Sequence, residues 1–381
     1  MKRTLILLPV FSALLLAAGV QKPEVKSVEY KKITLKNQFL SVELLPESMG
    51  RIDRIIYVPG NYSILFPRHM VKTDHGTLLK NLRGNEFGSC DSFTHRDMRP
   101  RENKMSVEQP DERTVIFSAK NYGGEPVNLT RKIVLAENGT KISVTSRLEW
   151  TGKDNTSVAP RWDFFLNGGD PLPKRRNLFI PLVRLKDKDG KYDTLVRWQQ
   201  RMVTPSDNFL AVAIPPEKLS FALIVDPDSF GKEGKFYTLS SGYNSRWYWW
   251  MAFILPPQKM SKGDVREYSF DAAVFPGFTD LKEICGDIAM RCYVTRSTKP
   301  WILGVVLAPS SACEAGDIRL VLTSEDGKKF EKTVKLPALI PGKQRNVSWS
   351  LSGVPAGRYR VSGEISGKGE FSFPEPVIQI K

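Results

Sequence analysis

Short runs of alternating apolar and polar residues cover most of the chain and are separated by turn residues. Residues 36–61 read KNQFLSVELLPESMGRIDRIIYVPGN, in which Pro46 and Gly50 bound a break between two such runs. Proline fixes φ and glycine permits a positive φ, so this segment predicts two strands joined by a tight turn. Asn138-Gly139 predicts a primed two-residue turn in a hairpin. Further strands are predicted at 114–120, 127–136, 141–150, 162–166, 194–198, 209–214, 221–225, 235–239, 247–255 and 266–274.

Helical periodicity is not sustained over ten residues anywhere, and only 278–290 is compatible with a helical turn or two. The pattern therefore predicts an all-β chain of the sandwich or barrel-like class. After about residue 299 the runs shorten, and turns recur about every ten residues. This spacing predicts a small immunoglobulin-like β-sandwich, with the ring of Tyr359 in its core.

The chain has 381 residues, which exceeds the roughly 250–300 at which a single core stops growing, so two domains are expected. Met1-Lys2-Arg3 precedes an apolar run over 5–18 and a small-residue cleavage pattern, which predicts a secretory signal peptide. We expect a signal peptide at 1–19, a first domain at 20–280, a linker at 281–297 and an immunoglobulin-like domain at 298–381. The mature protein is then expected to be secreted or periplasmic and not embedded in a membrane.

The formal net charge is +15. This balance favours acidic partners such as acidic glycans, although a solvated basic surface without a specific partner is an alternative. The basic residues are scattered, and with an export signal we expect no nucleic-acid partner. Among the four cysteines, Cys285 and Cys292 could form a disulfide or remain buried free thiols, and both possibilities stay open. No Cys/His spacing predicts zinc, and we expect no metal and no cofactor.

Four segments in order, 36–61, 148–158, 161–167 and 255–270, resemble the galactose mutarotase-like (aldose 1-epimerase-like) superfamily. The resemblance covers about residues 28–278 and implies a supersandwich of antiparallel sheets with a sugar-sized cleft. Enzymes of this superfamily use a His and a Glu on opposite sides of the sugar ring. Here the corresponding positions read Arg161-Trp162, without His, and Pro257-Gln258-Lys259, without Glu. The resemblance thus implies the fold more strongly than the reaction, and whether the chain is an enzyme stays open.

Candidate catalytic residues come from the irregular region 69–101, which is rich in Gly, Asn, Asp, Arg and His. They are His95 and His75, with Glu86 or Asp91 as the carboxylate partner, because His is the natural proton shuttle. The alternative is that these loop histidines are simply solvated.

Candidate ligand-binding residues pair cationic or acidic side chains with aromatic rings, since sugars offer both hydroxyls and C–H faces. In a strand, Trp247 and Trp249 face one side and Tyr248 and Trp250 the other, so one pair is expected in the core. Both faces being buried is the alternative. The candidates are Arg161, Asp163, Arg246, Trp247, Trp249 and Arg96.

Together these features predict a carbohydrate-binding protein, with an acidic glycan as one ligand class. Two alternatives stay open: an epimerase-like or polysaccharide-processing enzyme, and a structural or adhesive surface protein.

Overall fold

The structure is a computed structural model of the whole chain. It describes residues 31–65, 88–93, 104–167, 180–182, 201–203, 205, 207–243, 246–295 and 300–380. The predicted signal peptide at 1–19 lies outside these residues, as do His75, Glu86, His95 and Arg96.

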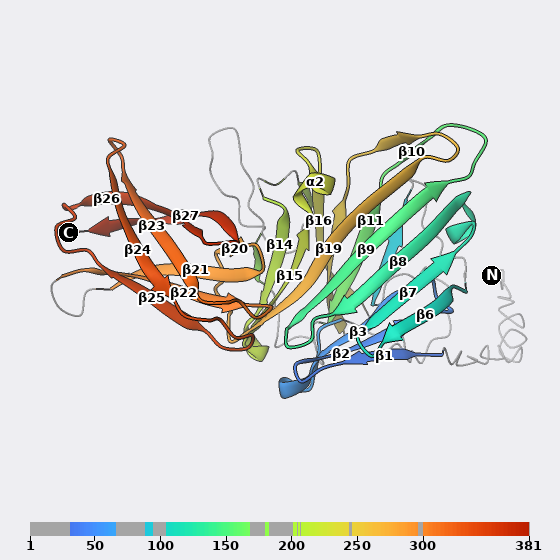
Figure 1. Cartoon of the computed structure of the whole chain (residues 1–381), viewed down its shortest axis with the longest axis horizontal. Helices are drawn as coiled ribbons and strands as arrows, with labels where there is room; N and C mark the ends of the chain where they lie inside the picture. The colour runs from blue at the N-terminus through green and yellow to red at the C-terminus, as the bar shows by residue number, and fades with distance from the viewer. Residues whose placement is uncertain are drawn as a thin grey trace, which may run out of the picture.

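Antiparallel sheets make up the first domain (Figure 1), which confirms the predicted all-β class. Within the described residues, its two largest sheets have the strand orders β12-β14-β15-β19-β9-β8-β7-β6 and β13-β16-β17-β11-β5; we call them the eight-stranded and the five-stranded sheet. A four-stranded sheet, β1-β2-β3-β4, and a two-stranded one, β10-β18, complete the described part. The strands are β1 (Ile33–Lys36), β2 (Leu40–Leu45), β3 (Arg51–Tyr57), β4 (Tyr62–Ser63), β5 (Ser89–Ser92), β6 (Ser106–Asp111), β7 (Thr114–Ala119), β8 (Val127–Leu135), β9 (Lys141–Trp150), β10 (Thr156–Val158), β11 (Arg161–Asn167), β12 (Ile180–Leu182), β13 (Arg201–Val203), β14 (Phe209–Ile214), β15 (Leu219–Val225), β16 (Lys235–Tyr243), β17 (Arg246–Ile254), β18 (Gln258–Met260) and β19 (Val265–Pro276). A short helix, α2 (Pro227–Phe230), follows β15.

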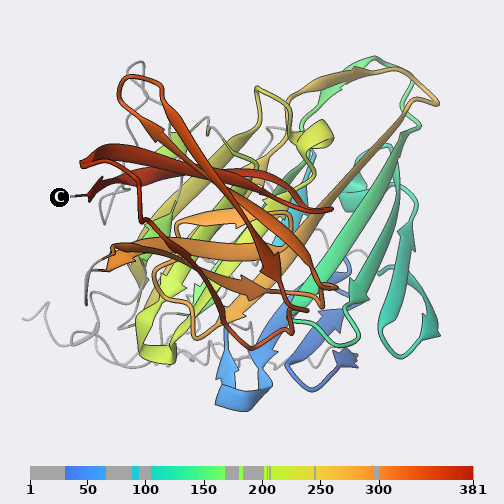
Figure 2. The same cartoon turned by 60° about the vertical axis from the view of Figure 1, so that its left-hand side comes forward.

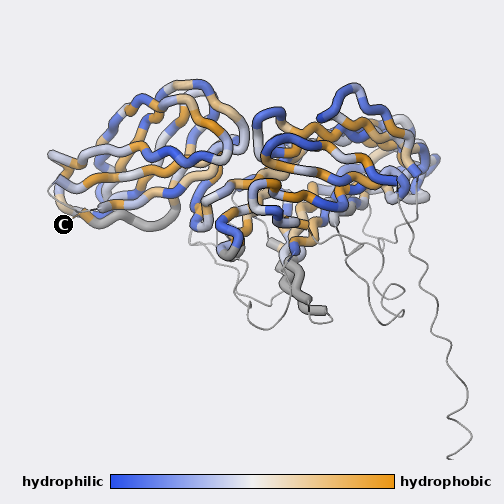
Figure 3. The backbone as a smooth tube through the Cα atoms, turned by 90° about the horizontal axis from the view of Figure 1, so that it is seen from below, coloured by the Kyte–Doolittle hydropathy of each residue, from blue (hydrophilic) through white to orange (hydrophobic). Residues whose placement is uncertain are grey.

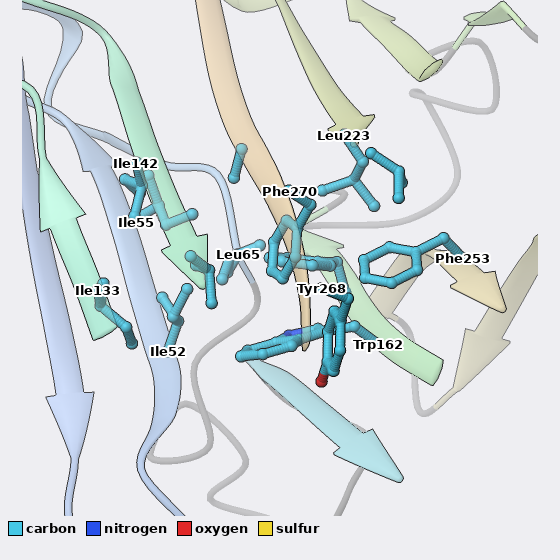
Figure 4. Close-up of a cluster of buried hydrophobic side chains, with 14 of the residues drawn as sticks. Ile52, Ile55, Leu65, Ile133, Ile142, Trp162, Leu223, Phe253, Tyr268 and Phe270 are labelled. Carbon is cyan, nitrogen blue, oxygen red and sulfur yellow. The ribbon is translucent and has the colours of Figure 1, made fainter. Parts of the chain in front are cut away.

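The core of the first domain lies between the inner faces of these sheets (Figure 4). Alternate residues of β8 and β9 are buried, as the alternation of their sequence predicts. On β11, Trp162 and Phe164 are fully buried and meet Phe270 of β19, with ring centroids 4.8 and 5.8 Å away. These edge-to-face contacts join the five-stranded sheet to the eight-stranded one. The alternate residues of β11, which are Arg161, Asp163 and Phe165, therefore point to the opposite, outer face of the sheet.

A second sandwich follows, coloured orange to red in Figure 2. In the described residues it consists of two four-stranded sheets, β20-β21-β22-β25 and β24-β23-β26-β27. Its apolar and polar positions alternate along the strands (Figure 3). Tyr359 is 3% exposed, as predicted, and its hydroxyl donates a hydrogen bond to the carbonyl of Pro355 at 2.8 Å. The strands are β20 (Glu283–Cys285), β21 (Ile288–Thr295), β22 (Ile302–Pro309), β23 (Gly316–Ser324), β24 (Lys329–Leu336), β25 (Arg345–Ser350), β26 (Gly357–Ile365) and β27 (Gly369–Ile380).

The sandwich architecture confirms that part of the prediction, while the immunoglobulin-like assignment of this domain stays a prediction. The expected linker at 281–297 is corrected, because β20 and β21 occupy it and pair with β22 in one sheet. The second sandwich therefore begins near Glu283. The helical turns expected at 278–290 are also replaced by these two strands.

An apolar cluster joins the two domains and is called here the interdomain cluster. It combines residues from the outer face of β14, β15 and β19 with residues of β20, β21 and β22 and the connection between them: Phe209, Ala211, Ala222, Ala273, Phe275, Phe278, Leu281, Ile284, Ala289, Val306 and Ala308. Beside it, the amide of Thr140 donates a hydrogen bond to the carbonyl of Ser310 at 2.7 Å.

The expected primed turn at Asn138-Gly139 does not form, because neither residue has a positive φ. The loop between β8 and β9 instead packs against the second domain.

No helix in the described part of the chain has both the length and the apolar composition needed to cross a membrane.

Candidate functional site

The outer face of the five-stranded sheet carries the predicted ligand-binding residues Arg161 and Asp163. They are two positions apart on β11, so both project away from the core that Trp162 enters. On the neighbouring strand β17, Ala252 pairs with Asp163, and on β16 Tyr237 pairs with Ala252. Asp163, Ala252 and Tyr237 thus form one row across three strands. Trp250 lies in the next row on the same face of β17.

Asp163 organises this face. Its side chain is fully buried, and its carboxylate accepts hydrogen bonds from Arg161 Nε at 2.9 and 3.1 Å and from Arg161 Nη2 at 2.7 Å. It also accepts a bond from the indole Nε1 of Trp250 at 2.7 Å. Burial raises the pKa of the Asp163 carboxyl, although the charge of Arg161 and the bonds from Arg161 and Trp250 act in the opposite direction. One carboxylate therefore orients both Arg161 and Trp250.

The Arg161 guanidinium lies beside two aromatic rings that contact each other, Tyr237 and Trp250, whose centroids are 4.8 Å apart. Its guanidinium carbon is 5.1 Å from the centroid of Tyr237 and 5.2 Å from that of Trp250. The Arg161 side chain is 23% exposed, and its Nη1 has no hydrogen-bond partner among the described residues. The arrangement presents a fixed, planar donor at the surface, beside aromatic rings.

Asp91, predicted as a catalytic carboxylate, lies on the other face of the sheet. On β5 it pairs with Trp162 and so points toward the core. Its side chain is 3% exposed, forms a buried ion pair with Arg131 of β8, and accepts a hydrogen bond from the hydroxyl of Tyr122 at 2.6 Å. The guanidinium carbon of Arg131 is 4.4 Å from the Trp162 ring centroid. This placement separates Asp91 from Arg161 and Asp163 and argues against a catalytic role.

The remaining predicted residues are not placed with their side chains. His75, Glu86, His95 and Arg96 lie outside the described residues. For Arg246, Trp247 and Trp249 the structure gives only the backbone of β17, where their partners on β16 are Tyr243, Gly242 and Ser240. In the described part of the chain, His, Cys, Asp and Glu side chains form no group of three or more that could hold a metal ion.

The sequence analysis missed two residues of this face, Tyr237 and Trp250. Trp250 was part of the aromatic run but was assigned to the pair opposite Trp247 and Trp249. The alternation of side chains along the strand could have identified Trp250, because it precedes the buried Met251 and so points to the opposite face. Tyr237 gave no signal, because its place beside Arg161 depends on the pairing of the β16–β17 hairpin with β11, which lies far away along the chain.

Solved structures of galactose mutarotase-like proteins resemble this chain, as the sequence predicted. One from Lactobacillus casei has 11% identity and a TM-score of 0.48, and the match covers 64% of this chain and all of that one. A galactose mutarotase related enzyme from Lactobacillus acidophilus has 8% identity and a TM-score of 0.47 (66% and 99% covered). A galactose mutarotase-like protein from Clostridium acetobutylicum has 9% identity and a TM-score of 0.46 (65% and 95% covered). No family model matches this chain, and neither does any curated protein. At these identities and TM-scores, the similarity does not indicate an activity for this chain.

Proposed function

We propose that this protein binds a carbohydrate on the outer face of the five-stranded sheet, at Arg161 and Trp250. The observation that carries the proposal is the Arg161 guanidinium, which Asp163 holds against the contacting rings of Tyr237 and Trp250 while the Arg161 side chain stays 23% exposed. Such an arrangement places a hydrogen-bond donor and aromatic surface side by side. Sugars have matching hydroxyls and C–H faces.

The site is held in position before any ligand arrives. Asp163 fixes Arg161 through bonds to two of its nitrogens and fixes Trp250 through its indole nitrogen. Phe165 supports the Trp250 ring from the neighbouring strand, with centroids 5.3 Å apart. Binding therefore costs little side-chain entropy, which favours affinity.

The charge of the site favours a neutral sugar. The two-nitrogen contact with Asp163 balances the positive charge of Arg161, so a ligand carboxylate would compete with a carboxylate already in place. Sugar hydroxyls need only the Nη1 donor, which has no partner among the described residues, and the ring faces. The acidic glycan that the overall charge of +15 favours is the rival class. Raising the salt concentration separates them, because only binding of a charged ligand weakens with screening.

A glycan array with the mature chain identifies ligands, and calorimetry then compares variants. We expect Arg161→Ala to weaken binding by about 1.5–3 kcal/mol, the range for hydrogen bonds to charged groups. Arg358→Ala is the matched control, since Arg358 lies in the second domain and pairs with the exposed Glu325. Circular dichroism checks that both variants fold. If Arg161→Ala binds every array ligand as tightly as Arg358→Ala does, the proposal is wrong.

A further inference from the structure

A groove of about 990 Å³ lies between the eight-stranded sheet and the second domain, remote from Arg161. Figure 1 shows the elements that form its walls, β14, β15, β19 and α2 on one side and β23, β26 and β27 on the other. The volume is at the upper end of the range of ligand sites, about 300–1,000 Å³, and such sites often lie between domains.

The walls of the groove are fixed relative to each other. Phe209 and Ile284 line the groove and also belong to the interdomain cluster, so its floor is part of the packed contact between the domains. Both are nearly fully buried. Because this contact is apolar and shared by strands of both domains, the groove is a preformed feature rather than a hinge.

Two ion pairs converge on the groove from opposite walls. On the first domain, Lys141 Nζ lies 3.0 Å from Asp271, whose other oxygen accepts a bond from Ser143 at 2.6 Å. On the second domain, Lys368 Nζ lies 2.9 Å from Asp287, which also accepts a bond from Ser311. Burial alone would raise the pKa of Asp287, but the bonds from Ser311 and Lys368 and the charges of Lys368 and Lys141 outweigh it and lower that pKa. The amide of Thr140 bonds to the carbonyl of Ser310 at 2.7 Å, and the amide of Ser310 bonds to the carbonyl of Asp287 at 2.9 Å, so the two pairs lie on either side of one interdomain contact.

These ion pairs decide which ligands suit the groove. Their side chains are partly exposed, from 9% for Asp287 to 28% for Lys368, so a ligand can reach them. Within these two pairs each carboxylate is balanced by a lysine, which leaves lone pairs and N–H groups to bond a ligand. The lining holds seven acidic and four basic side chains, which disfavours anionic ligands. At the rim, Asp226 Oδ2 accepts bonds from Ser229, while Oδ1 has no partner among the described residues.

We propose that this interdomain groove binds a neutral, hydroxyl-rich chain, of which a linear oligosaccharide is the natural example. Alternating hydroxyls bond to the carboxylate and ammonium groups of the two ion pairs. The site is separate from the outer face of the five-stranded sheet and does not depend on the function proposed there.

The test uses the full mature chain, calorimetry and four neutral probes: maltohexaose, cellohexaose, xylohexaose and mannohexaose. Spermidine and a hexagalacturonate represent cationic and anionic ligands. Thr323→Trp places a large ring in the groove from β23, and Thr333→Trp is the matched control on the same face of the same sheet, exposed and outside the lining. We expect at least one neutral probe to bind the parent. Thr323→Trp should bind that probe about tenfold or more weakly, and Thr333→Trp should bind it within about twofold of the parent affinity.

Three results overturn the proposal. The first is that no neutral probe binds the parent, and the second is that Thr323→Trp binds the neutral probe as tightly as the parent does. The third is that Thr323→Trp weakens only the binding of spermidine or of the galacturonate. Arg161→Ala distinguishes the two sites. It should leave groove binding unchanged, so the failure of either proposal leaves the other standing. Circular dichroism of both Trp variants excludes misfolding as the cause of a loss.

Discussion

At the scale of single residues, the ion pair of Asp91 and Arg131 is a costly group to bury in the core. Both side chains are almost fully buried, and Tyr122 donates a further hydrogen bond to the carboxylate. Burial raises the pKa of Tyr122 well above its usual value, and the nearby Asp91 charge adds to this, so the hydroxyl stays protonated and keeps donating. Burial would lower the pKa of Arg131, but the charge of Asp91 together with the interactions of Tyr122 and Tyr268 outweighs it and raises that pKa. Arg131 therefore keeps its charge in the core.

Removing one partner of this pair should lower the free energy of unfolding far more than removing both. Asp91→Ala leaves the Arg131 charge buried without its carboxylate, and we expect a loss of about 3–5 kcal/mol in the free energy of unfolding. The double variant Asp91→Ala with Arg131→Met should be markedly more stable than the single one. Urea unfolding measures all three proteins, with Glu325→Ala at an exposed pair as the control, expected to cost less than about 1 kcal/mol. Equal losses in the single and control variants would contradict the buried-pair account.

The cysteines provide a second prediction at this scale. The structure holds Cys285 and Cys292 as free, buried thiols, which is one of the two alternatives that the sequence left open. Burial raises the pKa of each thiol to about 12, and for Cys285 the charges of Glu283 and Asp287 add to the effect. Only the thiolate reacts with alkylating reagents, so a raised pKa means slow reaction at neutral pH.

We therefore expect iodoacetamide to label the partly exposed Cys313 before Cys285 and Cys292 in the native protein at pH 7.5. Labelling of Cys285 and Cys292 should be slow and should accelerate as the pH rises toward 12, because the thiolate fraction then grows. Peptide mass spectrometry assigns each label, and labelling in urea is the control in which the three react alike. Rapid labelling of Cys292 at pH 7.5 would show that this thiol is accessible and contradict the expectation.

At the scale of elements, strands were predictable where alternation and local turns determine them. Residues 209–214 form β14 with the predicted bounds, and the turn between β2 and β3 has Gly50 at φ +60°. Predictions failed where distant residues decide. Asn37 interrupts the strand expected to run through it, and its side-chain amide donates hydrogen bonds to the carbonyls of Ala136 and Gly139, 99 and 102 positions later, at 2.7 and 2.8 Å. Contact with the second domain likewise overrides the turn preference of Asn138-Gly139.

The candidate site shows the same limit. Alternation along β11 is enough to place Arg161 and Asp163 on one face and Trp162 on the other. The guanidinium stack also needs Tyr237 and Trp250, and these come into place only through the register of β16, β17 and β11. The sequence likewise gave no means of assigning Asp91 to the core, because its partner Arg131 lies 40 positions later on the opposite sheet.

At the scale of the whole molecule, the interdomain cluster decides whether the two domains behave as one. Each domain has its own buried core, so each has the means to fold. The cluster between them is apolar and continuous, which is the condition under which domains unfold together rather than independently. Coupling through this contact also keeps the walls of the interdomain groove at a fixed separation.

Phe278 is the residue that tests this coupling. It is fully buried in the interdomain cluster, in the connection between β19 and β20. Phe278→Ala should cost about 3–5 kcal/mol, as for other buried Phe side chains, and the loss should fall on the contact between the domains. We expect calorimetry to show one thermal transition for the parent and two for the variant. Phe117→Ala, buried in the core of the first domain alone, is the matched control and should lower the transition temperature without dividing the transition. Two transitions in the parent, or one in Phe278→Ala, would mean that this cluster does not couple the domains.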